Sequence, residues 1–140
     1  MSKGPLRFLD ATVVMYALGG PHPLKYPCQK FLIDTKAGKW LLATDTEVLQ
    51  EILYRYFSIH RADLAEAAYN AIVEICLEIF PVTLADLDRT LGLLKRHSAI
   101  TSRDAVHAAV MLNNRLREII SADRHFDQIP GIRRVDPVGV

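Results

Sequence analysis

The chain has 140 residues, of which half are hydrophobic and 24% are charged. This length suits one ordinary domain, residues 1–140, and this composition excludes disorder, so we expect a core that needs no disulfide or metal for stability. Because 17 basic and 16 acidic residues leave a net charge of +1, broad nonspecific adhesion to nucleic acid is not expected, although a short basic rim is compatible with this balance.

Short apolar segments alternate with helical patterns in the first part of the chain. The segment LRFLDA predicts a buried strand that ends at Asp10, and TVVMYAL predicts a helical turn or two after it. The segment GGPHPLKYP contains two Gly and three Pro, which predict a loop before a helix at about 28–36. WLLA is expected to form a second strand, and a helix follows from Thr44 with Val48, Ile52 and Tyr56 on its apolar face.

The same alternation continues to the end of the chain. Residues 61–77 predict a long Ala-rich helix, IFPVT a short strand, and residues 84–97 another helix. Thr101 or Ser102 can cap a helix over about 103–116. EIISAD then predicts a strand that ends at Asp123, and RRVDP predicts a last edge strand.

Strands separated by helices indicate an α/β fold with a parallel sheet and helices on both faces. In such sheets ligands bind beyond the carboxyl ends of the strands. Asp10 and Asp123 both follow predicted strands, so we expect the functional site at that edge.

Cysteine content and hydropathy exclude several classes. Cys28 and Cys76 are the two cysteines, with no CxxC and no nearby Cys/His set, so we expect reduced, buried thiols and neither a zinc site nor a disulfide framework. No apolar run is long enough to span a bilayer, and MSKGPLRFLD lacks the apolar core of a signal peptide. We therefore expect a cytoplasmic protein without a membrane partner.

Four acids lie at the edges of apolar segments, and each has a structural and a functional interpretation. Asp10 can cap the helix TVVMYAL or bind a metal, and the Thr12 hydroxyl can lie beside the same ion or its water. Glu47 fits a capping box that begins at Thr44, whereas Glu51 lies beyond the first turn and has no such role. Glu51 is therefore the better ligand candidate of the two.

The acids of the carboxyl-terminal half have equally simple alternatives. Asp104 completes a capping box with Thr101, and Asp123 is a loop acid after a strand. Asp127 is expected to be a turn residue or to support the ligands from outside. His107 lies one turn after Asp104, but a lone helical histidine is usually packed or solvated, and His125 belongs to no zinc-like spacing.

The four acids predict a function only when they are considered together. Clustered carboxylates repel one another in a cleft unless a cation compensates for their charge. Oxygen ligands that leave room for water suit Mg²⁺ or Mn²⁺, which can activate a water molecule for attack on a phosphodiester. The set therefore predicts metal-assisted phosphodiester hydrolysis.

Four short segments carry a family resemblance: FLDATVVMYAL, VLQEILYR, SRDAVHAA and SADRHFD. With these segments in this order, the chain resembles PIN-domain ribonucleases from Phe8 to about Val135, and most of all the VapC toxins of bacterial and archaeal toxin–antitoxin pairs. The resemblance implies a PIN-like three-layer fold with a central, mainly parallel sheet of four to five strands flanked by helices. It also implies a homodimer and an antitoxin protein whose carboxyl-terminal peptide covers the cleft.

The resemblance also assigns residues. It implies a set of catalytic and metal-binding acids: Asp10, Glu51, Asp104 and Asp123. It places Thr12 and Ser121 as supporting hydroxyls, while Glu47 competes with Glu51 for the second acid. The expected substrate is RNA, in the class of tRNA or rRNA loops, with Arg103 and Arg124 available to its phosphates.

Three alternatives remain open from the sequence. The first is a PIN-like scaffold that binds RNA or protein without cleavage, against which the retained acids argue. The second is a housekeeping PIN nuclease that is not a toxin. The third is a receiver-like phosphoacceptor, which the helical position of Glu51 fits poorly.

Overall fold

The computed structural model describes residues 4–140, so the first three residues of the segment MSKGPLRFLD lie outside it. Among the described residues, five strands form one sheet in the spatial order β3-β2-β1-β4-β5, and every neighbouring pair is parallel. The strands are β1 (Leu6–Leu9), β2 (Leu41–Asp45), β3 (Glu78–Phe80), β4 (Glu118–Ile120) and β5 (Arg133–Val135). The predicted parallel α/β sheet is confirmed, with five strands.

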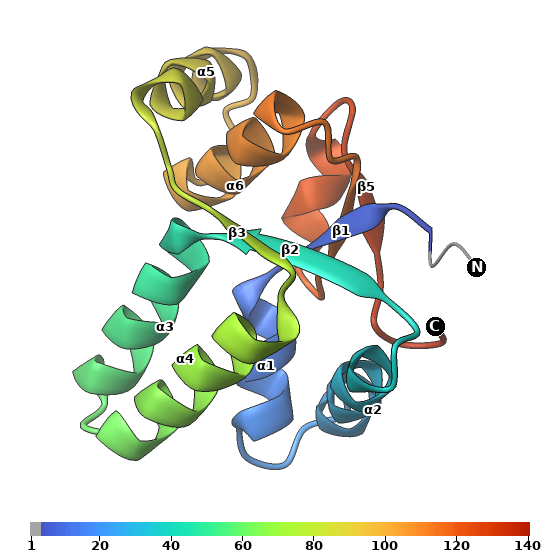
Figure 1. Ribbon diagram of the computed structural model, residues 1–140. Coiled ribbons are helices and arrows are strands. Elements are labelled where there is room, and N and C mark those ends of the chain that lie inside the picture. The colour runs from blue at the N-terminus through green and yellow to red at the C-terminus, as the bar shows by residue number, and fades with distance from the viewer. Residues whose placement is uncertain (1–3) are drawn as a thin grey trace.

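Helices cover both faces of this sheet. They are α1 (Ala11–Leu18), α2 (Lys25–Lys36), α3 (Thr46–Ser58), α4 (Ala62–Ile75), α5 (Leu84–Arg96), α6 (Ser102–Asn113) and the short 3₁₀ helix η1 (Arg124–Gln128). Figure 1 shows α1 to α4 on one side of the sheet and α5 and α6 on the other, which gives the three layers expected. Within residues 4–140, no helix is both long and apolar enough to cross a membrane.

The order of the strands determines where a site can form. After β1 the chain adds β2 and then β3 on one side, and it later returns to place β4 on the other side of β1. The connections that follow β1 and β4 therefore lead to opposite sides of the sheet. In parallel sheets, a crevice forms beyond the carboxyl ends of two strands at such a switch point. The backbone amide of Asp10 donates to the carbonyl of Ile120 at 3.0 Å, which holds the two strand ends together.

Apolar runs explain the central strands and the covering helices. Phe8 and Leu9 of β1 are fully buried, as expected for a strand with helices on both faces. The predicted stripe of α3 is confirmed, because Val48, Ile52 and Tyr56 are all buried. Burial of side chains of this size stabilises the fold by about 1.5–3 kcal/mol each.

Several helix limits differ from the prediction. Helix α2 begins at Lys25 rather than at residue 28, because Pro27 lies in the first turn, where its missing amide breaks no helical hydrogen bond. Helix α4 spans 62–75 rather than 61–77. Helix α6 ends at Asn113, three residues before the predicted limit, although Thr101 caps it as predicted by accepting from the Asp104 amide.

The start of α3 corrects a structural interpretation of Glu47. Thr44 and Asp45 belong to β2, and Asp45 is the cap: its carboxylate accepts from the Val48 amide at 2.9 Å. The Thr44 hydroxyl instead donates to the carbonyl of Leu9 at 2.9 Å. The predicted capping box from Thr44 to Glu47 is therefore wrong, and Glu47 loses its structural role at the helix start.

The end of β4 also differs from the prediction. The strand ends at Ile120, three residues before Asp123, which lies in the turn that leads into η1. There the Asp123 carboxylate accepts from the His125 amide at 2.9 Å. The predicted edge strand near the carboxyl terminus is confirmed as β5.

Candidate active site

Three adjacent strands bring polar residues to one edge of the sheet. Asp10 follows β1, Asp45 ends β2, and Ser121 follows β4, and all three side chains are buried. Because parallel strands end at the same edge, residues separated by more than 70 positions meet there. The carboxyl edge of the sheet is thus the polar end of an otherwise apolar core.

Asp10 is held by two hydroxyl groups. Thr12 Oγ1 donates to Asp10 Oδ2 at 2.8 Å, and Ser121 Oγ donates to the same oxygen at 2.6 Å. The Ser121 hydroxyl also accepts from the Asp123 amide at 2.9 Å, so it links two of the four acids. Asp10 stands at the cap position of α1 but its side chain makes no capping bond, so the capping interpretation of its carboxylate is wrong.

The surroundings of Asp10 disfavour its negative charge. Burial raises the pKa of this carboxyl above its ordinary value, and the charge of Glu51 adds to the rise. The His107 charge and the hydroxyls of Ser121 and Thr12 offset part of that rise. The pKa of Asp10 remains raised despite these groups, and a cation beside its carboxylate would stabilise the negative charge further.

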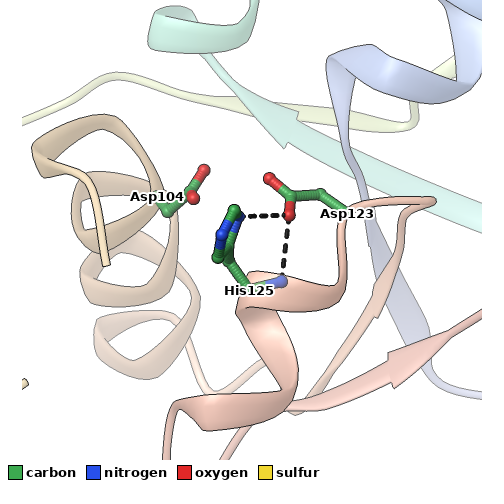
Figure 2. A group of neighbouring side chains, drawn as sticks. All are labelled: Asp104, Asp123 and His125. Atoms are coloured by element: carbon green, nitrogen blue, oxygen red, sulfur yellow. Dashed lines mark hydrogen bonds and ion pairs between the residues drawn. The ribbon is translucent and has the colours of Figure 1, made fainter. Parts of the chain in front are cut away.

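Asp104 and Asp123 lie close together near the carboxyl edge of the sheet. Figure 2 shows their carboxylates pointing toward one another, from α6 and from the turn before η1, with the ring of His125 beside both. One donor atom from each of the three residues lies within 4.8 Å of the other two. The His125 ring is anchored there by Nδ1, which lies 2.7 Å from Asp123 Oδ1.

The Asp104 carboxyl is perturbed in the same direction as that of Asp10. Burial first, and then the charges of Asp123 and Asp10, raise its pKa to about 6. Only half of the predicted capping box forms, because the Thr101 hydroxyl accepts from the Asp104 amide but the Thr101 amide does not donate to the Asp104 carboxylate. The Asp104 carboxylate thus lies close to Asp123 without closing the capping box.

Glu51 is held by a buried histidine. His107 of α6 is fully buried, its Nδ1 lies 2.8 Å from Asp45 Oδ2, and its Nε2 is hydrogen-bonded to Glu51 Oε1. A ring that faces a carboxylate at both nitrogens donates from both, which is the form of a charged imidazolium. Burial opposes that charge, but the charges and hydrogen bonds of Asp45 and Glu51 outweigh it and raise the pKa of His107 well above its ordinary value.

Glu47 and Arg103 lie at the edge of this group. Burial raises the pKa of Glu47, which also senses the charges of His107 and Glu51. Arg103 Nη1 lies 3.5 Å from Glu51 Oε2, and its side chain is largely exposed. The crevice therefore has a basic residue at its rim, as the sequence predicts.

The two remaining candidates, Arg124 and Asp127, belong to η1. Asp127 pairs with Arg134, with Nε 3.0 Å from Oδ1, so it takes part in the packing of the turn. Arg124 is exposed at the start of η1. It makes no hydrogen bond or ion pair with its side chain among residues 4–140, and it lies next to Asp123 in the chain.

The sequence reasoning missed three residues of the site. His107 and Asp45 support Glu51, and His125 lies between Asp104 and Asp123. The position of His107 one turn after Asp104 was the available signal, but its partners lie on β2 and α3, far away in the chain. The sequence spacing of His125 indicates no zinc site, but the turn after Asp123 places its ring beside two acids.

The donor set fits a hard divalent cation. Carboxylate oxygens dominate this group, and the pKa values of Asp10 and Asp104 are raised first by burial and then by the charges of neighbouring carboxylates. Mg²⁺ and Mn²⁺ prefer such oxygen ligands, and Mn²⁺ also accepts an imidazole nitrogen. The described residues thus provide ligands at the edge of the sheet where the fold leaves a crevice.

Comparison with known proteins agrees with this geometry. The model of the PIN domain family matches residues 7–132. Ribonuclease VapC13 of Mycobacterium tuberculosis is 37% identical over 127 residues, which cover 91% of this chain and 97% of the relative. Ribonuclease VapC7 of the same species is 32% identical over 131 residues, which cover 92% of this chain and 90% of that protein.

A solved structure gives the same fold. The crystal structure of Mycobacterium tuberculosis VapC20, described as a sarcin-ricin loop cleaving toxin, aligns with a TM-score of 0.73 at 16% identity and covers 88% of this chain and 93% of its own. At this identity the match shows the fold alone. The family model and the curated relatives together show that this chain belongs to the PIN domain family, in its VapC branch.

Proposed function

We propose that this chain is a divalent-metal-dependent endoribonuclease and the toxin of a toxin–antitoxin pair, acting in the cytoplasm. The observation that carries the proposal is the meeting of Asp10, Asp104 and Asp123 at the carboxyl edge of the sheet, with Glu51 fixed beside them by His107. Four carboxylates in one partly buried crevice repel one another, which makes a cation site the simplest use of the arrangement.

Each residue of the site has a distinct role in this proposal. Asp10, Asp104 and Asp123 would hold the ion, and Glu51 would join them directly or through water. When bound, a divalent cation supplies positive charge against the phosphate and activates the attacking water. Thr12 and Ser121 keep Asp10 in place through their hydroxyls, and the other residues orient the acids from behind.

The carboxylate-rich ligand set favours Mg²⁺ or Mn²⁺. His125 gives the site one nitrogen donor near Asp104 and Asp123. A role for His125 as a ligand would shift the preference toward Mn²⁺, because imidazole suits transition metals better than Mg²⁺. Parallel titrations of the purified chain with the two ions, for wild type and His125→Ala, would decide between them.

Loops of RNA fit the crevice better than a regular duplex. Bases in single-stranded loops can be splayed apart, and their phosphates are accessible to basic side chains. Arg103 and Arg124 stand at the rim of the acidic crevice, where a phosphate on either side of the scissile bond would pass. The curated relatives are named ribonucleases, which supports RNA as the substrate class.

An antitoxin is the proposed protein partner. One solved structure with this fold is described as a toxin–antitoxin complex from Klebsiella pneumoniae, with a TM-score of 0.66 at 16% identity and coverage of 96% of this chain and 99% of its own. Expression of this chain should arrest growth, and the product of an adjacent small gene should relieve the arrest. A chain that cleaves RNA without arresting growth would instead be a housekeeping nuclease.

A homodimer is also proposed, through the outer face of α5. Leu84, Leu87 and Leu91 are spaced three and four residues apart on this helix and are 75%, 48% and 57% exposed. Exposed apolar stripes of this kind mark protein interfaces. Leu91→Glu should convert a dimer to a monomer in light scattering, whereas Leu77→Glu, an exposed leucine outside α5, should not.

Asp10→Asn tests the nuclease proposal. The substitution removes the charge but keeps an oxygen that can accept from Thr12 and Ser121, so the fold should persist. Metal-dependent cleavage of RNA should fall by at least about a hundredfold, since a metal ligand contributes several kcal/mol to the transition state. Asp88→Asn changes an exposed acid of α5 and serves as the matched control.

The controls separate the proposal from a noncleaving scaffold. A wild-type chain that binds RNA but leaves it intact in Mg²⁺ and in Mn²⁺ would support the scaffold instead. Full activity in the purified Asp10→Asn variant would contradict the proposal that this carboxylate is a metal ligand.

A further inference from the structure

A groove beside the acidic crevice centres on Arg55 of α3. A hollow of about 560 Å³ is lined by Glu51, Arg55 and Arg103, among others. A second of about 430 Å³ extends from Thr12 to His22, and a third of about 470 Å³ reaches Arg61. Arg55 lines all three hollows, so they adjoin one another around its guanidinium.

The groove is continuous with the proposed catalytic acids. Glu51 lines the first hollow, and Thr12, whose hydroxyl donates to Asp10, lines the second. Arg55 follows Glu51 by four residues, so it lies one turn farther along the same face of α3. A strand that leaves the acids in this direction therefore passes Arg55.

The charge of the groove is positive apart from Glu51. Among the described residues that line the three hollows, Arg55, Arg61 and Arg103 are the arginines and Glu51 is the one acid. Arg61 is already held by both carboxylate oxygens of Asp63, and Arg103 lies near Glu51. Arg55 is exposed and makes no side-chain hydrogen bond or ion pair within residues 4–140, which leaves its guanidinium available to an anion.

The walls of the groove also offer aromatic faces. The rings of Tyr16 and His22 lie together on the wall of the second hollow, with centroids 4.6 Å apart and planes inclined by 35°. Tyr54 is 60% exposed on the wall of the first hollow. Aromatic faces beside an unpaired arginine match a single nucleic-acid strand, whose bases stack while its phosphates bind cations.

We propose that this groove binds the RNA strand flanking the cleavage site, with Arg55 on a phosphate and Tyr16, His22 and Tyr54 beside the bases. The inference rests on the proposed ribonuclease function and extends it by naming the path of the substrate. An RNA strand is preferred over a protein segment because the groove combines basic charge with stacking surfaces and opens directly onto the acids. Arg55 is a substrate-binding residue here and takes no part in the chemical step.

Two substitutions test this path from opposite walls. Arg55→Gln removes the charge from a residue whose side chain makes no hydrogen bond or ion pair with residues 4–140. Gly20→Tyr adds a ring to a residue that lines two of the hollows, where a Cβ atom would meet nothing within 4 Å. Arg117→Gln is the control, because Arg117 is an exposed arginine just before β4, at the opposite end of that strand from Ser121.

The binding experiment uses the full chain in EDTA and a fluorescent single-stranded RNA of mixed sequence, about twenty nucleotides long, a length that exceeds a typical single-strand binding site. Arg55→Gln should weaken binding about tenfold and lower the slope of log Kd against log salt by about one, as expected for one lost phosphate contact. Gly20→Tyr should weaken binding with little change in that slope. Arg117→Gln should match wild type in both quantities.

Cleavage assays with Mg²⁺ complete the test. Arg55→Gln should raise the RNA concentration needed for half-maximal cleavage and leave the maximal rate within about twofold of wild type, because the contact is made in the ground state and the transition state alike. If wild type cleaves RNA and Arg55→Gln matches it in affinity and salt slope, the inference is overturned and the proposed function stands. If wild type neither binds nor cleaves RNA, both are overturned.

A protein occupant would give a different result. In that case Arg55→Gln and Gly20→Tyr would leave RNA affinity unchanged and would weaken only the complex with the proposed antitoxin. That outcome would also overturn the assignment of the groove to RNA.

Discussion

Glu51 and His107 are 56 residues apart in the chain and are joined by a partly buried hydrogen bond between Oε1 and Nε2. The other ring nitrogen of His107 is bound to Asp45, so the imidazolium connects β2, α3 and α6. Glu51 is thereby fixed by a group that carries the opposite charge. In metal sites, a group that hydrogen-bonds to a ligand orients that ligand and tunes the affinity of the site for the metal.

His107→Ala should destabilise the fold and reduce activity together. The substitution leaves Asp45 buried without its countercharge, and removal of one partner from a buried pair costs about 3–5 kcal/mol. Urea unfolding of the variant would measure the loss. His97→Ala, which removes a partly buried histidine with no side-chain partner among residues 4–140, is the control. Equal stability of the two variants would show that His107 does not hold these elements together.

Glu51→Gln and Glu47→Gln should differ in their effect on cleavage. The charge of Glu51 contributes to the raised pKa of Asp10. Glu47 lies at the edge of the group, where the charges of His107 and Glu51 affect its pKa. We expect Glu51→Gln to lower the rate at saturating metal by on the order of a hundredfold and Glu47→Gln by less than about tenfold. The reverse order, measured by single-turnover cleavage, would assign the second acid to Glu47.

Asp104→Asn should stabilise the metal-free protein. Because the pKa of Asp104 in the folded chain is about 6, above its ordinary value, the ionised form at neutral pH costs stability that the neutral amide does not. The midpoint of thermal unfolding in EDTA should rise by roughly 2–4 °C for each kcal/mol gained.

The same variant should respond less to metal. Wild type should gain about 2.7 kcal/mol of stability at a metal concentration of one hundred times Kd, since the ion binds only the folded chain. Asp104→Asn should show a much smaller rise in unfolding temperature on addition of Mn²⁺. An equal rise in both proteins would mean that Asp104 is not a ligand.

Both thiols should react slowly in the native state. Burial raises the pKa of Cys28 to about 11 and that of Cys76 to about 12, and neither cysteine is in a disulfide. At pH 8 only about one Cys28 side chain in a thousand is then a thiolate, the form that reacts. Mass spectrometry after iodoacetamide treatment should show little modification in buffer and two alkyl groups in urea. Rapid native labelling would contradict this prediction.

Sequence patterns predicted the elements well where local chemistry is strong. The apolar runs around Phe8 and Leu42 gave buried strands, and the period of Val48, Ile52 and Tyr56 gave the face of α3. Element ends were less predictable, because they depend on competing caps. Thr44 and Asp45 can each start a helix, and Thr44 stays in the strand because it pairs with Ile79 of β3 and its hydroxyl donates to the carbonyl of Leu9.

The identities of the acids were within reach of the sequence, but their surroundings were not. Asp10 and Asp123 could be placed at one edge of the sheet because parallel strands end on the same side. Thr12 is two residues from Asp10 in the chain, so its supporting hydrogen bond is a local contact. His125 is also local to Asp123, but its nearness to Asp104 of α6 is a tertiary contact.

The sequence by itself determined the alternation of strands and helices, the family and the acids available to a metal, because these follow from local periodicity and residue type. Only the tertiary structure decided which acids meet, that His107 holds Glu51, and that Arg55 stands in a groove leading from them. The physical reason is that burial and charge compensation depend on contacts between strands and helices far apart in the chain. A carboxylate has the same local sequence whether it faces solvent, a helix amide or three other acids, and only its neighbours in space change its pKa.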